Sequence, residues 1–178
     1  MLKTQDTVLV LVDFQGKLAR IVQDSDAVIA SARRLVRGAG VLAVPVLWTE
    51  QNPRGLGATV PELAELLPGE PIPKLSFSCC GEEPFVEALE RGGRRHVLLA
   101  GIEAHVCVYQ TAADLLESGY EVEVVADAVS SRTAENRAIA LARMGQLGAA
   151  ITSVEMALFE LLGRAEGPRF KRLLEIVK

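Results

Sequence analysis

The run Val8-Leu9-Val10-Leu11-Val12 constrains the fold most, because five consecutive β-branched or leucine residues suit a central strand that is buried on both faces. Further strand-like runs follow at 41–49, 71–75, 95–100, 120–126 and 149–152. Helical patterns lie between and after them, at 27–38, 60–67, 84–90, 104–118, 133–147, 154–162 and 168–177. This alternation predicts an α/β fold: a three-layer, doubly wound sheet of about six parallel strands with helices on both faces.

Two boundaries in this reading rest on glycine and proline. Gly38 and Gly40 are expected to end the first long helix, and the second strand is expected to begin at Val41. Pro45 then falls inside that strand, where its missing N–H predicts a bulge or an edge position. The stretch 51–57 is expected to be a loop by its composition.

Length and composition indicate one globular domain over residues 1–178, with 49% hydrophobic residues and a net charge of −4. The charges of both signs are interspersed, which argues against nucleic acid or a membrane surface as a partner. No apolar run reaches the length of a membrane span, and the N-terminus resembles no signal peptide. Three cysteines without a Cys-x-x-Cys motif favour a reducing, cytoplasmic location.

Three chemically active side chains follow predicted strands: Asp13 after the first, Lys74 near the third and Cys107 after the fourth. Ligands of doubly wound sheets bind beyond the carboxyl ends of the strands. Cys107 falls in the first turn of a helix, where the helix dipole favours the thiolate, so we expect its pKa below the free value of about 8.5. A small buried hydrophobe is the alternative role for this cysteine. In the first role, Cys107 is a nucleophile, Asp13 its base and Lys74 the cation that stabilises both.

The same residues lie in three motifs that resemble the isochorismatase-like cysteine hydrolase superfamily, which includes nicotinamidases and N-carbamoylsarcosine amidase. The motifs are Val10-Leu11-Val12-Asp13-Phe14-Gln15, Pro73-Lys74-Leu75-Ser76-Phe77-Ser78 and Gly101-Ile102-Glu103-Ala104-His105-Val106-Cys107-Val108.

The resemblance implies a six-stranded parallel sheet and a catalytic triad of Asp13, Lys74 and Cys107. It also implies a cis peptide bond between Ile102 and Glu103, with the N–H groups of Glu103 and Cys107 forming an oxyanion hole. Phe14 and Gln15 are implied to line the substrate pocket, and the chain is implied to form dimers or larger assemblies.

Two departures from the family narrow the chemistry. Nicotinamidases carry an Asp-x-His metal cluster after the second strand, whereas this chain has no histidine there and only two in all, His96 and His105. A zinc or iron site needs several convergent ligands, so we expect no metal and no other cofactor. Isochorismatases lack the nucleophilic cysteine, so the presence of Cys107 argues against isochorismate as substrate.

Several other residues have two possible roles. We assign Trp48, Glu50, Phe77 and His105 to the wall of the substrate pocket, although Trp48 and Phe77 would also suit the core or a subunit interface. His105 would pair with Cys107 as a base only if the two faced each other, and residues two apart on a helix do not. Adjacent Cys79 and Cys80 would form a strained ring as a disulfide, so two reduced thiols are expected.

These observations predict a hydrolase that cleaves a C–N bond of a small amide or carbamoyl-type substrate through a thioester on Cys107. The alternative is a catalytically silent, oligomeric binding or scaffold protein with the same fold. A nucleotide- or flavin-binding protein is a third reading, but no G-x-G-x-x-G follows the first strand. The expected partners are a small-molecule substrate and further copies of the chain, with the apolar segment 156–162 and Trp48 at the interface.

Overall fold

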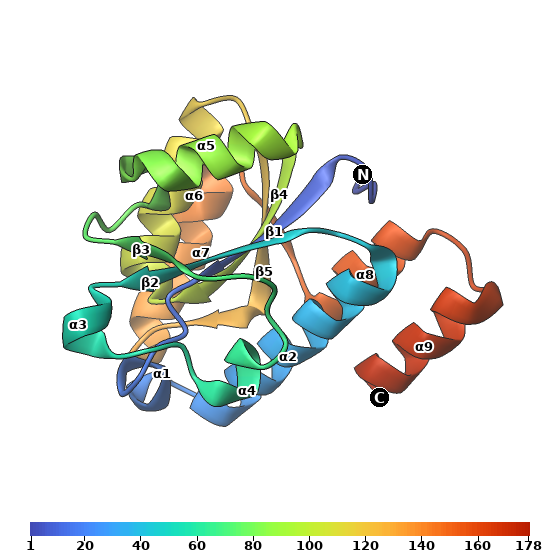
Figure 1. Cartoon of the computed structure of the whole chain (residues 1–178), viewed down its shortest axis with the longest axis horizontal. Coiled ribbons are helices and arrows are strands. Elements are labelled where there is room, and N and C mark those ends of the chain that lie inside the picture. The colour runs from blue at the N-terminus through green and yellow to red at the C-terminus, as the bar shows by residue number, and fades with distance from the viewer.

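The computed structural model describes residues 1–178 and contains one six-stranded parallel sheet with the strand order β3-β2-β1-β4-β5-β6 (Figure 1). The strands are β1 (Thr7–Val12), β2 (Val46–Gln51), β3 (Ile72–Lys74), β4 (His96–Ile102), β5 (Glu121–Ser130) and β6 (Ala150–Thr152). The predicted doubly wound fold is therefore confirmed. The strand order reverses between β1 and β4, where such sheets form a crevice at their carboxyl edge.

Helices cover both faces of this sheet (Figure 1). One face carries α2 (Ser25–Leu42), α8 (Val154–Leu162) and α9 (Gly167–Val177), with short α1 (Leu18–Ile21) and α4 (Pro61–Ala64). The opposite face carries α5 (Glu83–Gly92), α6 (Tyr109–Glu117) and α7 (Ala134–Gln146). No helix of the chain is both long and apolar enough to cross a membrane.

The first strand divides its side chains between two hydrophobic cores. Leu9 and Leu11 pack with α2, α8 and α9, while Val8, Val10 and Val12 pack with α5, α6 and α7. All six residues of the strand are buried, since successive side chains of a strand point to opposite faces and both faces are covered. An uninterrupted apolar run is the expected sequence for such a strand.

The end of α2 and the start of β2 differ from the prediction. The helix runs past Gly38 and Gly40 to Leu42, and Ala43 ends it in the left-handed conformation with its N–H bonded to Ala39 O and Gly40 O. The glycines do not stop the helix because its apolar face is buried along its whole length. Pro45 precedes β2 and contributes only its carbonyl, which accepts the N–H of Leu9 at 2.9 Å.

Other boundaries shift around the carboxyl edge of the sheet. The strand β4 continues through Gly101 to Ile102, and β5 reaches Ser130, four residues beyond its predicted end. The predicted loop 51–57 holds the single turn α3 (Pro53–Leu56). Gly101 has a φ of +150°, and a Cβ there would lie 2.4 Å from Val12 O. A glycine is therefore required for β1 and β4 to approach each other at this point.

We predict opposite effects for two glycines of α2. A Cβ on Gly38 would lie 2.4 Å from a methyl of buried Leu158, whereas a Cβ on Gly40 would meet nothing within 4 Å. Gly38→Ala should lower the free energy of unfolding by about 1–3 kcal/mol through overpacking. Gly40→Ala should raise it by about 0.5–1 kcal/mol, because alanine favours the helix more than glycine does. Urea denaturation of both variants measures the difference, and equal shifts would contradict the packing between α2 and α8.

Candidate active site

Asp13 directly follows β1, at the point where the strand order reverses. Its backbone is left-handed, with a φ of +56°, a conformation that aspartate adopts more readily than most residues. The N–H of Gln15 donates to the Asp13 carbonyl at 2.8 Å and closes this turn. The turn places a buried carboxylate over the carboxyl edge of the sheet.

Lys74 is the last residue of β3 and forms an ion pair with Asp13, with 2.7 Å between Lys74 Nζ and Asp13 Oδ2. Neither side chain has any exposed area. The ammonium also donates to Gln51 Oε1 at 2.6 Å, to the Phe77 carbonyl at 3.0 Å and to the Ser76 carbonyl at 3.2 Å. A buried charge is tolerated only when it is paired and hydrogen-bonded, and this one is both.

The second oxygen of the Asp13 carboxylate is held by β2. Thr49 Oγ1 donates to Asp13 Oδ1 at 2.8 Å, and the Thr49 side chain is buried. In the register of β1 and β2, Thr49 lies beside Val12, and Val12 directly precedes Asp13. The sheet register therefore fixes the orientation of the carboxylate.

Cys107 lies in a π-helical turn, Ala104–Val108, that links β4 to α6. Such turns are rare and frequently occur at functional sites. The thiol is 7% exposed and contacts Gln51 Oε1 at 3.9 Å, the same oxygen that accepts from Lys74. Gln51 therefore bridges the ammonium and the thiol.

The electrostatics of Cys107 are opposite to the prediction from the sequence. Burial and, after it, the neighbouring Asp13 charge raise the pKa of the Cys107 thiol, the Lys74 charge partly offsets both, and the resulting pKa is about 12. The expectation of a pKa below 8.5 is wrong because Lys74 is already neutralised by Asp13 and the thiol is shielded from water. The sulfur is therefore protonated at neutral pH.

The peptide bond between Ile102 and Glu103, just before this turn, is cis. The Glu103 carbonyl accepts the N–H groups of Val106 at 3.1 Å and Val108 at 3.3 Å. The Glu103 carboxylate pairs with Arg132, with 2.8 Å between Oε1 and Nε. These contacts fix the backbone on both sides of Cys107. The use of the Glu103 and Cys107 N–H groups as an oxyanion hole stays a prediction.

Four residues expected at the substrate pocket are buried and make contacts within the chain, and their role in the pocket stays a prediction. Phe14 and Trp48 belong to the core on the α2 side, and the Trp48 indole donates to Pro68 O at 2.9 Å. Glu50 Oε1 accepts from Thr59 N at 2.6 Å and Thr59 Oγ1 at 2.8 Å, which secures the loop before α4. Gln15 is fully buried, and its amide bonds to backbone atoms of Gln51 and Gly57. These four therefore support the loops around the site.

Phe77 and His105 lie closer to the site. The Phe77 side chain is 55% exposed, beside the carbonyl that accepts from Lys74. His105 Nδ1 lies 3.0 Å from Oγ of Ser131, the residue directly after β5. Cys79 and Cys80 are both free thiols, and burial raises their pKa values to about 12 and about 11.

The sequence reasoning missed Thr49 and Gln51. Both lie on β2, where the register with β1 places Thr49 beside Val12 and the register with β3 places Gln51 beside Lys74, and these two registers are the signal that would have found them. No group of three or more His, Cys, Asp or Glu side chains comes together in the structure in a way that could hold a metal.

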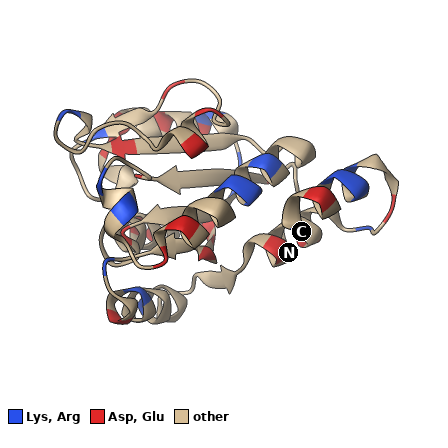
Figure 2. Ribbon diagram, turned by 90° about the horizontal axis from the view of Figure 1, so that it is seen from below, with Lys and Arg blue, Asp and Glu red and all other residues tan.

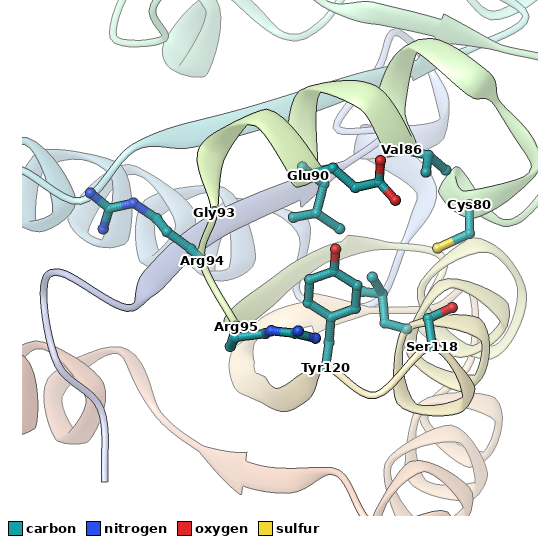
Figure 3. Close-up of a pocket in the computed structure, with 10 residues that line it drawn as sticks. Cys80, Val86, Glu90, Gly93, Arg94, Arg95, Ser118 and Tyr120 are labelled. Atoms are coloured by element: carbon teal, nitrogen blue, oxygen red, sulfur yellow. The ribbon is translucent and has the colours of Figure 1, made fainter.

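The structure contains two cavities of similar volume, one at the carboxyl edge of the sheet and one between two helices. One, of about 520 Å³, opens between the ends of β2 and β3 and is lined by Arg54, Lys74 and Glu82 among others. Another, of about 500 Å³, lies between α5 and α6, where Glu90, Arg95, Ser118 and Tyr120 gather and Arg94 points away (Figure 3). The second cavity contains none of the predicted catalytic residues, because Arg95 and Tyr120 precede their strands whereas Asp13 follows its own.

The comparisons with known proteins agree with this fold. The Isochorismatase domain matches residues 7–156. Isochorismatase domain-containing protein 2 of Xenopus laevis is 42% identical over 97% of this chain and 84% of its own. The MAR1 ribonuclease of Caenorhabditis elegans is 40% identical, with a TM-score of 0.92 over 99% of this chain and 91% of its own. The YcaC product of Escherichia coli is described as an octameric hydrolase of unknown specificity. It is 28% identical, with a TM-score of 0.92, and the match covers 98% of this chain and 88% of the YcaC chain.

The fold and the matched domain define a doubly wound α/β hydrolase. The chain belongs to the isochorismatase family, since the matched domain spans most of its length.

We predict a distinctive pH dependence for the reaction of Cys107 with iodoacetamide. With a thiol pKa of about 12, the rate should rise about tenfold per pH unit from about pH 7 to 9, without a plateau. Lys74→Ala should slow the reaction, because it removes the charge that lowers this pKa, and Asp13→Asn should accelerate it, because it removes a charge that raises it.

Peptide mapping isolates the signal, because trypsin places Cys107 in peptide 96–132 and both other cysteines in peptide 75–91. A plateau below pH 9, or the opposite order of the two variants, would contradict the electrostatics described above.

Proposed function

We propose that this protein is a cysteine-dependent hydrolase that cleaves a C–N bond of a small amide or carbamoyl-type substrate through a thioester on Cys107. The observation that carries the proposal is the fully buried Asp13–Lys74 ion pair beside the thiol of Cys107. A purely structural role does not account for this group. Burying two charges costs more free energy of folding than burying apolar residues of similar size.

In this mechanism Asp13 accepts the thiol proton as Cys107 Sγ attacks the carbonyl carbon of the substrate. A neutral thiol needs such a base, and Asp13 is the carboxylate whose charge acts on the Cys107 thiol. The developing oxyanion is bound by the N–H groups of Glu103 and Cys107. Asp13 then protonates the departing amine, and later takes a proton from the water that cleaves the thioester. Lys74 offsets the negative charge of the site throughout.

Cleavage of RNA is a second candidate activity, because the C. elegans relative at 40% identity is described as a ribonuclease. The charge of this chain argues against it: the net charge is −4, and Lys and Arg are interspersed with Asp and Glu (Figure 2). Binding of nucleic acid depends on a positively charged surface that contacts the phosphates. We therefore retain the proposal of a small-molecule substrate, without nucleic acid or membrane partners, in the cytoplasm.

The test is ammonia or amine release from a panel of small amides and carbamoyl compounds, with RNA as a separate substrate. Removal of Asp13, Lys74 or Cys107 should each abolish most of the rate, and removal of a second member should cost little more, because the three act as one unit. Asp13→Asn should be inactive although its thiol is more reactive towards iodoacetamide. A chelator should leave the rate unchanged.

Turnover by Cys107→Ala at the wild-type rate would contradict covalent catalysis. Cleavage of RNA alone would support the second candidate. A folded protein that releases no amine from any member of the panel would favour the catalytically silent scaffold.

We also propose that the chain forms homo-oligomers, as the octameric E. coli relative does. Much of the apolar segment 156–162 is already covered within the chain, since Leu158 and Leu161 are buried, and Trp48 is buried as well. Ile151 on edge strand β6 and Met156 remain exposed at 43% and 61%. These two residues, rather than Trp48, are therefore proposed for the interface.

Light scattering at micromolar concentration should give a mass above that of the 19.1 kDa monomer. Met156→Asp should lower that mass, because it places a charge in a contact of apolar side chains. Glu155→Ala, at an exposed neighbouring position, is the control and should leave the mass unchanged. A monomer mass for the wild-type protein would refute the proposal.

A further inference from the structure

The position of the Lys74 ammonium depends on the loop after β3, which contains none of the proposed catalytic residues. Two of its acceptors are the carbonyls of Ser76 and Phe77, at 3.2 and 3.0 Å, in the loop that follows β3. This loop is open to water, since Leu75 is 77% exposed and Phe77 is 55% exposed. Exposed loops without regular backbone pairing are mobile unless something ties them down.

Glu82 fixes this loop through hydrogen bonds. Its Oε1 accepts three hydrogen bonds from the loop: Leu75 N at 2.8 Å, Ser76 N at 2.9 Å and Ser76 Oγ at 2.7 Å. These bonds involve the residues directly after Lys74. Hydrogen bonds to a carboxylate are stronger than those between neutral groups, so one side chain fixes the backbone whose carbonyls hold the ammonium.

Gly81 allows this contact. A Cβ at this position would lie 2.7 Å from Ser76 Cβ and 2.8 Å from Ser76 Oγ, so any other residue would push the loop away from Glu82. The short 3₁₀ turn Cys79–Gly81 therefore brings Glu82, at the start of α5, back against the residues that follow β3.

We propose that Glu82 is a positioning residue of the active site, which holds Lys74 against Asp13 and Cys107 by fixing the backbone of Leu75 and Ser76. The proposal rests on the proposed function of the Asp13, Lys74 and Cys107 group. Glu82 does not touch the thiol; it acts through the carbonyls of Ser76 and Phe77.

The charge of Glu82 suits this role. Hydrogen bonds from the Ser76 N–H, the Ser76 hydroxyl and the Leu75 N–H hold the pKa of the Glu82 carboxyl below its usual value, and the Lys74 charge lowers it further. Because the pKa is lowered in the folded state, the contribution of the carboxylate to stability is present at neutral pH. It is lost only as the pH falls through the lowered value.

The experiment measures alkylation of Cys107 by iodoacetamide at pH 8, read in tryptic peptide 96–132, and needs no substrate. Glu82→Ala should slow the reaction by about three- to tenfold, because a displaced Lys74 favours the thiolate less and one pKa unit changes the thiolate fraction about tenfold. Glu82→Gln retains an acceptor oxygen and should restore part of the rate. Gly81→Ala, which leaves the carboxylate intact but displaces the loop, should slow it as well.

Glu83→Ala is the matched control, because it removes the same charge from the adjacent exposed position and should leave the rate unchanged. A second test separates positioning from a general loss of structure. In a Lys74→Ala background, Glu82→Ala should have no further effect, because the residue through which it acts is absent.

Equal rates for Glu82→Ala and the wild type would overturn the proposal, as would an undiminished effect of Glu82→Ala without Lys74. Thermal unfolding of each variant identifies any that fail to fold, and for those Glu82→Gln supplies the decisive comparison. Because alkylation is independent of turnover, a negative amide panel with the expected alkylation pattern would reject the proposed function and leave the positioning role of Glu82 supported.

Discussion

An ion pair without access to water is the interaction on which the rest of this structure depends. Asp13 and Lys74 come from the ends of β1 and β3, which are separated by β2 in the sheet. Removing one partner of a buried pair typically costs about 3–5 kcal/mol, because the other charge is left uncompensated. Thr49 on the intervening strand donates to Asp13, and Gln51 and the carbonyls of the loop after β3 accept from Lys74. The result is a site in which a neutral thiol lies next to a fixed carboxylate.

Most of the fold could be predicted from the sequence, because the central strands β1 and β4 are apolar runs and each long helix has a buried face. The boundary between α2 and β2 could not. Glycines in a helix are a weak signal when tertiary packing outweighs their intrinsic cost, and Gly38 is buried against Leu158. Pro45 was placed inside a strand because a sequence does not reveal that its carbonyl alone takes part in the sheet.

The candidate site could be predicted in part. Asp13 and Lys74 stand at strand ends, Cys107 lies in the turn after β4, and the topology brings them together. The pocket residues required knowledge of which face each side chain occupies: Trp48 points into the core, whereas its neighbour Thr49 reaches Asp13. The pKa of Cys107 depends on burial and on the pairing of Lys74, and neither can be read from position in a helix.

The glycine at the junction of β1 and β4 limits how proteins of this design can diversify. Gly101 pairs with Val12, and any side chain there would collide with the backbone directly before Asp13. The distance between the segments that carry Asp13 and Cys107 is thus limited by the contact of these two backbones. New specificities can arise from changes in the exposed loops after β2 and β3, while the seam between the two strands must be inherited unaltered.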